Sequence, residues 1–137
     1  MEFHFDVCGE DYSMAGSASG MIKKKLNQLG LPALIVRKTA IVMYEAEINM
    51  VIHAGGGVVD VSITPEAIQI VLKDEGPGIP DIDRAMEAGY STASDRAREL
   101  GFGAGMGLPN IQKNSDGLTI DSEVGRGTTV TIVVNLK

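Results

Sequence analysis

Three polar residues, Glu45, Asn49 and His53, are spaced four residues apart in the longest uninterrupted periodic segment of the chain, residues 33–54. In a helix this spacing places them on one side, one turn apart. Most of their neighbours are apolar, so the carboxylate and the carboxamide need hydrogen-bond partners. An amide oxygen suits Mg²⁺, a hard ion that binds oxygen ligands. A carboxylate one turn away could act as a general base.

A purely structural interpretation of the same side of the helix is also open. In it, Glu45 forms an ion pair with Lys38 or with a distant arginine. Asn49 then bonds to the backbone and His53 simply ends the helix, which is the interpretation that we favour for this histidine. Glu47 is two residues from Asn49, so it faces roughly the opposite side and is a poor candidate for the same site.

A second group of candidates lies in the glycine-rich stretch from Asp74 to Leu108, where seven of the 17 glycines fall between Gly76 and Gly107. Glycine loses more backbone entropy on ordering than any other residue, so this density indicates unusual backbone angles or close approach by a ligand. Asp74 ends an apolar strand and could accept a hydrogen bond from an exocyclic amine such as that of adenine. An aspartate that caps a turn is the simpler alternative.

The run from Gly101 to Gly107 precedes a predicted helix. A helix start offers free N–H groups and the positive end of the helix dipole, which favour phosphates. The run is neither a Walker A loop nor the Rossmann fingerprint, because the required residues and spacing are absent. The stretch therefore predicts a loop around an anionic ligand, for which a nucleotide is the best fit.

The elements that must position these residues follow from the hydrophobic periods. Alternation predicts strands, and helical spacing predicts helices with Ser13 or Ser17 as the first cap. The order implies an α+β fold, a two-layer sandwich with a mixed or antiparallel sheet and helices on one face. The first strand could pair across a homodimer or join its own sheet. The predicted strands are 3–7, 58–64, 67–74, 118–122 and 128–135, and the predicted helices are 13–29, 33–54, 81–88 and 108–114.

Size and composition limit the function classes. The 137 residues suit one domain, 1–137, and 44% apolar residues can build a core. A formal charge of −6 argues against nonspecific nucleic-acid binding, which needs a basic face. Cys8 is the only cysteine, so an intramolecular disulfide is impossible and a reducing compartment fits. We see neither a signal peptide nor an apolar run long enough to span a membrane, so we expect a cytoplasmic protein.

Four motifs in this order resemble the nucleotide-binding boxes of the GHKL ATPase superfamily. They are Glu45–Asn49, Asp74–Gly78, Gly101–Leu108 and Gly125–Thr128. Within the superfamily, the chain resembles the anti-sigma-factor serine/threonine kinases of the RsbT, RsbW and SpoIIAB type, and RsbT most closely through the tract from Gly78 to Thr92. The resemblance covers nearly the whole chain, and the ordered set of boxes is more specific than any single box.

The resemblance implies a Bergerat fold and an ATP- and Mg²⁺-dependent serine/threonine kinase that phosphorylates a STAS-domain antagonist in a partner-switching pathway. Asn49 would coordinate Mg²⁺, and Glu45 would activate the acceptor hydroxyl. Asp74 would bind the adenine amine, with support from Thr128. The other nucleotide-binding positions would be Gly76, Gly78, Ile79, Gly101, Gly103, Gly105, Met106, Gly107 and Leu108.

The resemblance leaves some functions and residues open. A sigma factor is a further partner that it suggests. The alternatives to a kinase are a nucleotide-gated regulatory binding module without phosphotransfer and a stand-alone histidine-kinase-like ATPase domain. Glu45 distinguishes the kinase from the binding module, because a kinase needs a base at this position and a pure binder does not. The charged segment 94–99 departs from the family pattern, and its Arg96 or Arg98 could contact the γ-phosphate or remain solvated.

Overall fold

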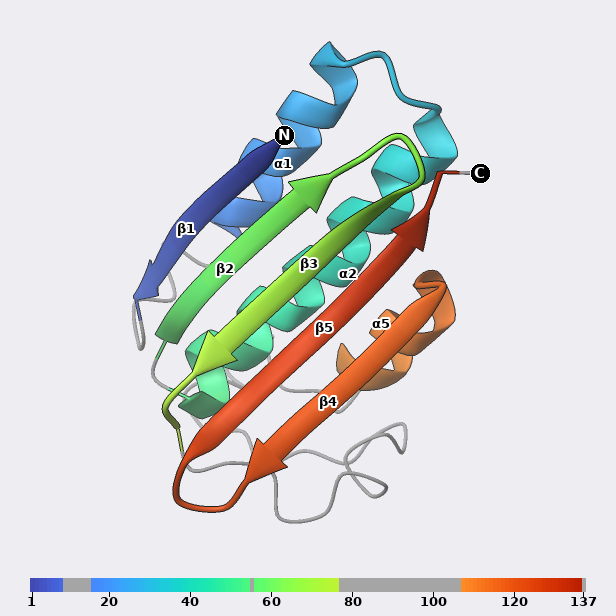
Figure 1. Cartoon of the computed structure of the whole chain (residues 1–137). Coiled ribbons are helices and arrows are strands. Elements are labelled where there is room, and N and C mark those ends of the chain that lie inside the picture. Colours follow the sequence, from blue (N-terminus) through green and yellow to red (C-terminus); the bar gives the residue numbers. More distant parts are fainter. Residues whose placement is uncertain (9–15, 55, 77–106, 137) are drawn as a thin grey trace.

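The fold is described from a computed structural model. The structure describes residues 1–8, 16–54, 56–76 and 107–136. In this part of the chain, five strands form one sheet and three helices cover one of its faces (Figure 1). The strands are β1 (Glu2–Cys8), β2 (Gly56–Ile63), β3 (Ala67–Asp74), β4 (Gly117–Glu123) and β5 (Gly127–Asn135). The helices are α1 (Ser17–Gln28), α2 (Ala33–Ala54) and α5 (Gly107–Asn114).

The strand order is β1-β2-β3-β5-β4, and every neighbouring pair is antiparallel. This confirms the predicted α+β two-layer class and decides between a mixed and an antiparallel sheet. β1 pairs with β2 of the same chain, which is the second of the two alternatives left open for this strand. The placement of β5 between β3 and β4 has a further consequence, because it brings the start of β5 beside the end of β3 (Figure 1).

The turn between β2 and β3 lies where the sequence predicts it. The hydroxyl of Thr64 accepts hydrogen bonds from the backbone N–H groups of Glu66 and Ala67, at 3.3 and 3.2 Å. A threonine that bonds to the backbone two and three residues further on stabilises such a tight connection. The hairpin therefore needs no glycine, and β3 runs from it to Asp74.

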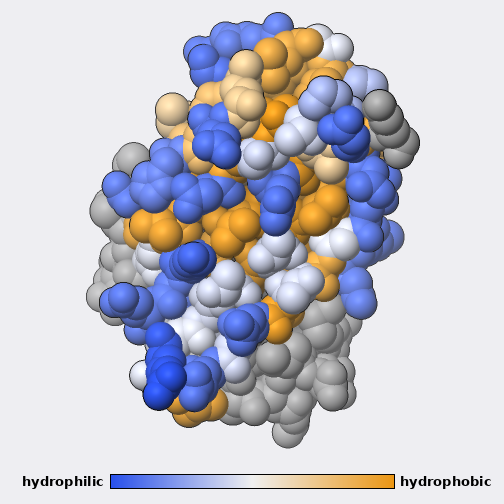
Figure 2. Space-filling view, in the orientation of Figure 1, coloured by the Kyte–Doolittle hydropathy of each residue, from blue (hydrophilic) through white to orange (hydrophobic). Residues whose placement is uncertain are grey.

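The core lies between the sheet and the helices. Alternate residues of the strands point toward α1 and α2, and each fully buried aliphatic side chain contributes roughly 1.5–3 kcal/mol. The opposite face of the sheet has no helix over it in Figure 1, and Figure 2 shows hydrophilic and apolar residues mixed across that face. The buried apolar residues of the core include Ile22, Leu26, Val36, Met43, Met50, Val59, Val61, Ile68, Ile70, Leu72, Ile132 and Val134.

The start of α1 differs from the sequence-based expectation. The helix begins at Ser17, and Gly16 takes the cap position with φ 90° and no side-chain hydrogen bond. Ser17 is thus the first helical residue and not the cap, whereas Ser13 lies outside the described residues. Glycine fits here for two reasons: a positive φ favours it, and a Cβ would collide with the ring of Tyr44 on α2.

A carboxylate from another helix replaces the missing cap. Glu47 of α2 is only 1% exposed, and its Oε2 accepts hydrogen bonds from the N–H groups of Gly16 and Ala18, at 3.1 and 3.3 Å. Its Oε1 accepts the N–H of Ser19 at 3.0 Å. These are orphan donors of a helix start, and the negative charge also complements the positive end of the helix dipole. One buried side chain therefore fixes α1 to α2.

The remaining predicted elements agree with the structure to within a few residues, except where the structure describes nothing. The predicted short helix at 81–88 lies outside the described residues. In the described ranges, none of the helices combines the length and the apolar content needed to cross a bilayer.

Candidate nucleotide-binding and phosphotransfer site

Glu45 and Asn49 lie one turn apart on α2, and both are half-buried. α5 packs against α2, and the side-chain amide of Asn110 donates a hydrogen bond to Glu45 Oε1 at 3.4 Å. Glu45 is therefore held by a neutral amide, a partner that neither of the sequence-based interpretations named. This leaves the carboxylate partly accessible and on the side of α2 that faces α5. The side chain of His53 is outside the described part of the structure.

Asp74 is the last residue of β3, and its Oδ1 accepts two backbone hydrogen bonds. The donors are the N–H of Gly76 at 2.9 Å and the N–H of Thr128 at 3.1 Å. The first bond is the turn cap that the sequence offered as the simpler alternative. The second links two strands, because Asp74 and Thr128 are register partners across β3 and β5. Among the described residues Oδ2 has no hydrogen bond, so a capping role and a ligand-binding role are compatible in one carboxylate.

Thr128 is 8% exposed, and its hydroxyl lies 2.8 Å from the hydroxyl of Ser122 on β4. The preceding Gly127 has φ 124°, and a Cβ there would collide with the carbonyl of Asp74. Only glycine combines this backbone angle with so close an approach. Thr128 of β5 thus binds Asp74 through its backbone and Ser122 of β4 through its hydroxyl, and the Asp74 carboxylate has a fixed orientation at the end of the sheet.

The Asp74 end of the sheet lies next to the second half of α2. A Cβ on Gly57 of β2 would contact both the sulfur of Met50 and the Cα of Asp74. Met50 directly follows Asn49, so the candidate metal ligand and the candidate base-binding residue belong to one region of the fold. Figure 1 shows the same arrangement: the C-terminal part of α2 lies behind the strand ends where β3 finishes and β5 begins.

The glycine-rich candidates fall partly inside and partly outside the described residues. Gly76 donates to Asp74 as described above. Gly107 and Leu108 form the start of α5, which follows the glycine run as the sequence predicts. The other candidates, together with Arg96 and Arg98, lie outside the described residues, namely Gly78, Ile79, Gly101, Gly103, Gly105 and Met106.

Two residues at this site were not found from the sequence. Asn110 stands in the first half of α5 beside apolar residues, and a polar side chain at that position is a weak signal by itself. Glu47 was set aside because it faces away from Asn49, which is correct, but its link to α1 was not foreseen. The available signal was the start of α1, which offers only small residues and therefore no strong charged cap.

The donor set around α2 suits a hydrated hard ion more than a cage of protein ligands. In the described ranges no group of three or more His, Cys, Asp or Glu side chains could hold a metal. Asn49 offers one half-buried amide oxygen. Mg²⁺ keeps several waters and is commonly bound by one or two protein oxygens together with substrate phosphates, so the residues present fit this ion as a companion of a nucleotide.

The comparisons with known proteins agree with this geometry. Residues 35–137 match the family model of histidine kinase-, DNA gyrase B- and HSP90-like ATPases. The chain belongs to this ATPase family. The matched residues include all but the first two residues of α2, together with Asp74, α5 and Thr128, so the family boundaries contain every described candidate residue of the site. An ATPase of this family uses ATP, and the ATP-binding part of the sequence-based interpretation is thereby confirmed.

Among curated proteins, the chain is similar to the serine/threonine-protein kinase RsbT of Bacillus subtilis. The two are 29% identical over 107 residues, which cover 75% of this chain and 74% of RsbT. It is also 34% identical to the anti-sigma F factor of Geobacillus stearothermophilus over 95 residues, which cover 65% of this chain and 62% of that protein. The match to the anti-sigma F factor thus spans less than two thirds of that relative. The resemblance to anti-sigma-factor kinases is confirmed.

A solved structure shows the same fold. A chain in the SiaB–SiaC complex from Pseudomonas aeruginosa superimposes with a TM-score of 0.63 at 14% sequence identity. The alignment covers 96% of this chain and 88% of that chain. At this identity the likeness concerns the arrangement of sheet and helices alone. The family match is what confirms the predicted histidine-kinase-like ATPase architecture.

Proposed function

We propose that this protein is an ATP-dependent serine/threonine protein kinase of the anti-sigma-factor type. Its substrate would be a STAS-domain antagonist protein in a partner-switching pathway, with a sigma factor as a further partner. The observation that supports this most is the position of Glu45, half-buried on the side of α2 that faces α5, in the same region as Asp74. A relative named as a serine/threonine-protein kinase supports the same activity.

In the proposed reaction the acceptor hydroxyl attacks the γ-phosphorus of ATP. The new bond joins the hydroxyl oxygen to phosphorus, and the bond from phosphorus to the β–γ bridging oxygen breaks, so ADP leaves. Glu45 receives the hydroxyl proton. Such acid–base assistance supplies roughly 10²–10⁴-fold in rate, and the rest of the acceleration in phosphoryl transfer comes from positioning and charge neutralisation.

Asp74 and Asn49 would bind the nucleotide from two sides. The carboxylate of Asp74 is fixed by backbone donors, so its Oδ2 can accept the adenine amine without a change of rotamer. Asn49 would hold Mg²⁺ through its amide oxygen. When bound, this ion neutralises phosphate charge, which is the main electrostatic need of the reaction.

A phosphotransfer assay with γ-labelled ATP, Mg²⁺ and the STAS-domain protein encoded nearest to this chain tests the proposal. We expect label on a serine or threonine of that protein. Glu45→Gln should slow the transfer by roughly 10²–10⁴-fold while ATP affinity stays within a few-fold of the wild type. Glu66→Gln is the matched control, because Glu66 is an exposed carboxylate in the β2–β3 turn.

The result that contradicts the kinase is tight ATP binding by the wild type without any label in a partner that binds it. That outcome favours the nucleotide-gated binding module, in which Glu45 has no role in catalysis. Equal transfer rates for Glu45→Gln and the wild type would instead remove Glu45 from the mechanism and keep the kinase.

A further inference from the structure

The side chain of Glu45 is held by an amide and not by a cation. Among the described residues, its one hydrogen bond is to the amide of Asn110, at 3.4 Å. Because a carboxylate can only accept hydrogen bonds, the NH₂ group of Asn110 and not its oxygen must face Glu45. Asn110 binds Oε1, and in the same part of the chain Oε2 has no hydrogen bond.

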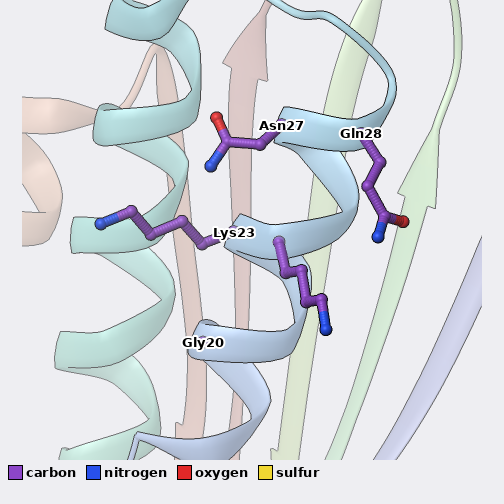
Figure 3. A pocket seen from close by; sticks show the side chains of 5 residues that line it. Gly20, Lys23, Asn27 and Gln28 are labelled. Carbon is purple, nitrogen blue, oxygen red and sulfur yellow. The ribbon is translucent and has the colours of Figure 1, made fainter.

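The cations that could neutralise Glu45 are used elsewhere or stay apart from it. Lys38 precedes it on α2, but the described ion pairs do not include Glu45. Two lysines of α1 border a shallow depression on that helix, of which Glu45 is not a part (Figure 3). The residues that line the depression are Gly20, Lys23, Lys24, Asn27 and Gln28. This suits a general base, because a cation beside a carboxylate stabilises its ionised form and weakens it as a base.

Asn110 is a residue type that a helix by itself does not favour. Asparagine is a poor helix former, because its side chain competes for nearby backbone groups. The other asparagine of α5 does bond locally: the amide of Asn114 donates to the backbone oxygen of Asn110 at 2.9 Å. The amide of Asn110 instead crosses to α2. The contact with Glu45 therefore accounts for an asparagine at position 110, whereas the needs of α5 do not.

The neighbours of Asn110 in sequence fix its position. Ile111 is fully buried in the hydrophobic core, so α5 cannot turn about its axis without exposing this side chain. Pro109 lies in the first turn of α5, where a residue without an N–H group is tolerated and φ is restricted. α5 also packs along α2. A side chain carried by such a segment can hold its partner in one orientation.

This arrangement orients a carboxylate without neutralising it. A glutamate side chain turns about three bonds, so a half-buried one that lacks a partner can adopt several orientations. A neutral donor on Oε1 selects one of them and leaves Oε2 to accept a proton. The distance of 3.4 Å is long for a hydrogen bond, but catalytic hydrogen bonds are commonly long before the reacting groups bind and shorten afterwards.

We propose that Asn110 is a positioning residue, whose amide holds the Glu45 carboxylate so that Oε2 accepts the proton of the acceptor hydroxyl. This inference rests on the proposed kinase function for the reaction that Glu45 serves. Asn110 touches neither the nucleotide nor the acceptor protein in this proposal. It acts only through Glu45, so its effect must disappear when Glu45 can no longer act as a base.

The test is a cycle of four proteins: the wild type, Asn110→Ala, Glu45→Gln and the double variant. Single-turnover and steady-state phosphotransfer are measured at saturating ATP with the STAS-domain protein encoded nearest to this chain, so that kcat and KM for the acceptor are obtained separately. Asn114→Ala is the matched control, because it removes an amide hydrogen bond from the same helix without touching Glu45. ATP affinity is measured for every variant and shows that it is folded.

We expect Asn110→Ala to lower kcat roughly 10–100-fold, since a misplaced reacting group costs rate more than binding. KM for the acceptor and ATP affinity should stay within a few-fold of the wild type, as should all constants of Asn114→Ala. In the Glu45→Gln background, Asn110→Ala should change kcat by less than about twofold, because two residues that act as one unit are not additive. An equal loss in both backgrounds, or no loss in either, would overturn the inference.

Two further substitutions separate the donor from the shape of the side chain. Asn110→Gln keeps an NH₂ group on a longer side chain and should recover part of the rate that Asn110→Ala loses. Asn110→Asp keeps the shape but places a like charge against Glu45, so it should lower kcat at least as much as Asn110→Ala. A wild-type kcat for Asn110→Asp would contradict the positioning role.

A measurement without phosphate transfer separates this inference from the proposed function. The side-chain amide signal of Asn110 in ¹H–¹⁵N NMR spectra is assigned from its loss in Asn110→Asp. Glu45→Gln should shift this signal, whereas Glu66→Gln, a change in the exposed β2–β3 turn, should not. Absence of any transfer by the wild type would contradict the kinase, and a shift on Glu45→Gln would still support the pairing. A signal that does not respond to Glu45→Gln would overturn the inference even if the kinase is active.

Discussion

Asp74 on β3 and Thr128 on β5 are register partners, and Asp74 Oδ1 accepts the backbone N–H of Thr128 at 3.1 Å. The two residues are 54 positions apart in sequence, so the sheet order β3-β5 is what joins them. One oxygen of the carboxylate is used for the fold, and the other has no hydrogen bond among the described residues. A ligand that binds Oδ2 would therefore leave the two hydrogen bonds of Oδ1 intact.

The first prediction concerns Asp74→Asn. An asparagine can keep an oxygen toward Thr128 and Gly76, so the fold should be preserved, but it then presents an NH₂ group to the adenine amine. Loss of a charge-assisted hydrogen bond of about 1.5–3 kcal/mol lowers ATP affinity roughly 10–100-fold. Calorimetric titration with ATP measures this, and Asp121→Asn on the exposed part of β4 is the control. Unchanged ATP affinity would exclude Asp74 from the nucleotide site.

The second prediction concerns Glu47→Gln. The substitution removes the charge that accepts three backbone N–H groups and places an NH₂ group near at least one of them. Because the site is buried, we expect a loss of about 2–4 kcal/mol in the free energy of unfolding. Urea denaturation measures it. Glu66→Gln removes an exposed carboxylate and should change stability by less than about 0.5 kcal/mol; similar losses in both variants would show that the Glu47 contacts contribute nothing specific.

The third prediction compares Gly125 in the β4–β5 turn with Gly127, the first residue of β5. Gly125→Ala meets open space but keeps φ 84°, so it costs roughly 1–2 kcal/mol. Gly127→Ala adds a collision with the carbonyl of Asp74 to a φ of 124°, and we expect at least about 2 kcal/mol more. Thermal unfolding ranks the two variants. A smaller loss for Gly127→Ala would mean that β3 and β5 can separate without cost at this end.

The fourth prediction concerns pH. The hydrogen bond from His4 to Asp60 on the neighbouring strand raises the pKa of His4 above 6.5, with a smaller contribution from Asp6. A raised pKa in the folded state adds stability that is fully present below the unfolded value of 6.5 and is lost as the pH rises through the folded value. NMR titration of His4 should therefore give a pKa above 6.5.

The control for this titration is Asp60→Asn, which removes the larger cause. In that variant the pKa of His4 should fall, whereas Asp6→Asn should lower it less, because Asp6 Oδ1 lies 3.4 Å from the ring and Asp60 Oδ1 lies at 2.6 Å. The pair is exposed, so added salt should reduce the shift in the wild type. The opposite order of the two variants would contradict this assignment.

Much of the fold was predictable, because its signals are local. Alternation gave the strands, and the absence of glycine and proline within residues 33–54 gave the longest helix. The partner of β1 was not predictable, since an alternating strand of this kind is equally suited to its own sheet or to another chain. The sheet order was likewise open, because hydrophobic period does not state which strands are neighbours.

In the candidate site, too, local features were predictable from the sequence and contacts between distant segments were not. The spacing of Glu45 and Asn49 predicted a shared side of one helix, and that side does face α5. The contacts that depend on distant segments were not predictable: Asn110 lies 65 positions from Glu45, and Glu47 lies 28 to 31 positions from the groups it binds. A helix without a capping side chain indicates that a donor group needs a partner, but the sequence does not say where that partner is.

The use of Glu47 as the cap of α1 has a consequence for how the chain folds. A helix of 12 residues is marginal by itself in water, and this one lacks a cap of its own. Its free N–H groups find an acceptor only after α2 has formed and docked. We therefore expect a peptide of residues 1–32 to show little helical circular dichroism, and we expect α1 to join a preformed α2 and sheet late in folding. Although α1 is the first described helix in the sequence, it would thus be among the last elements to become stable.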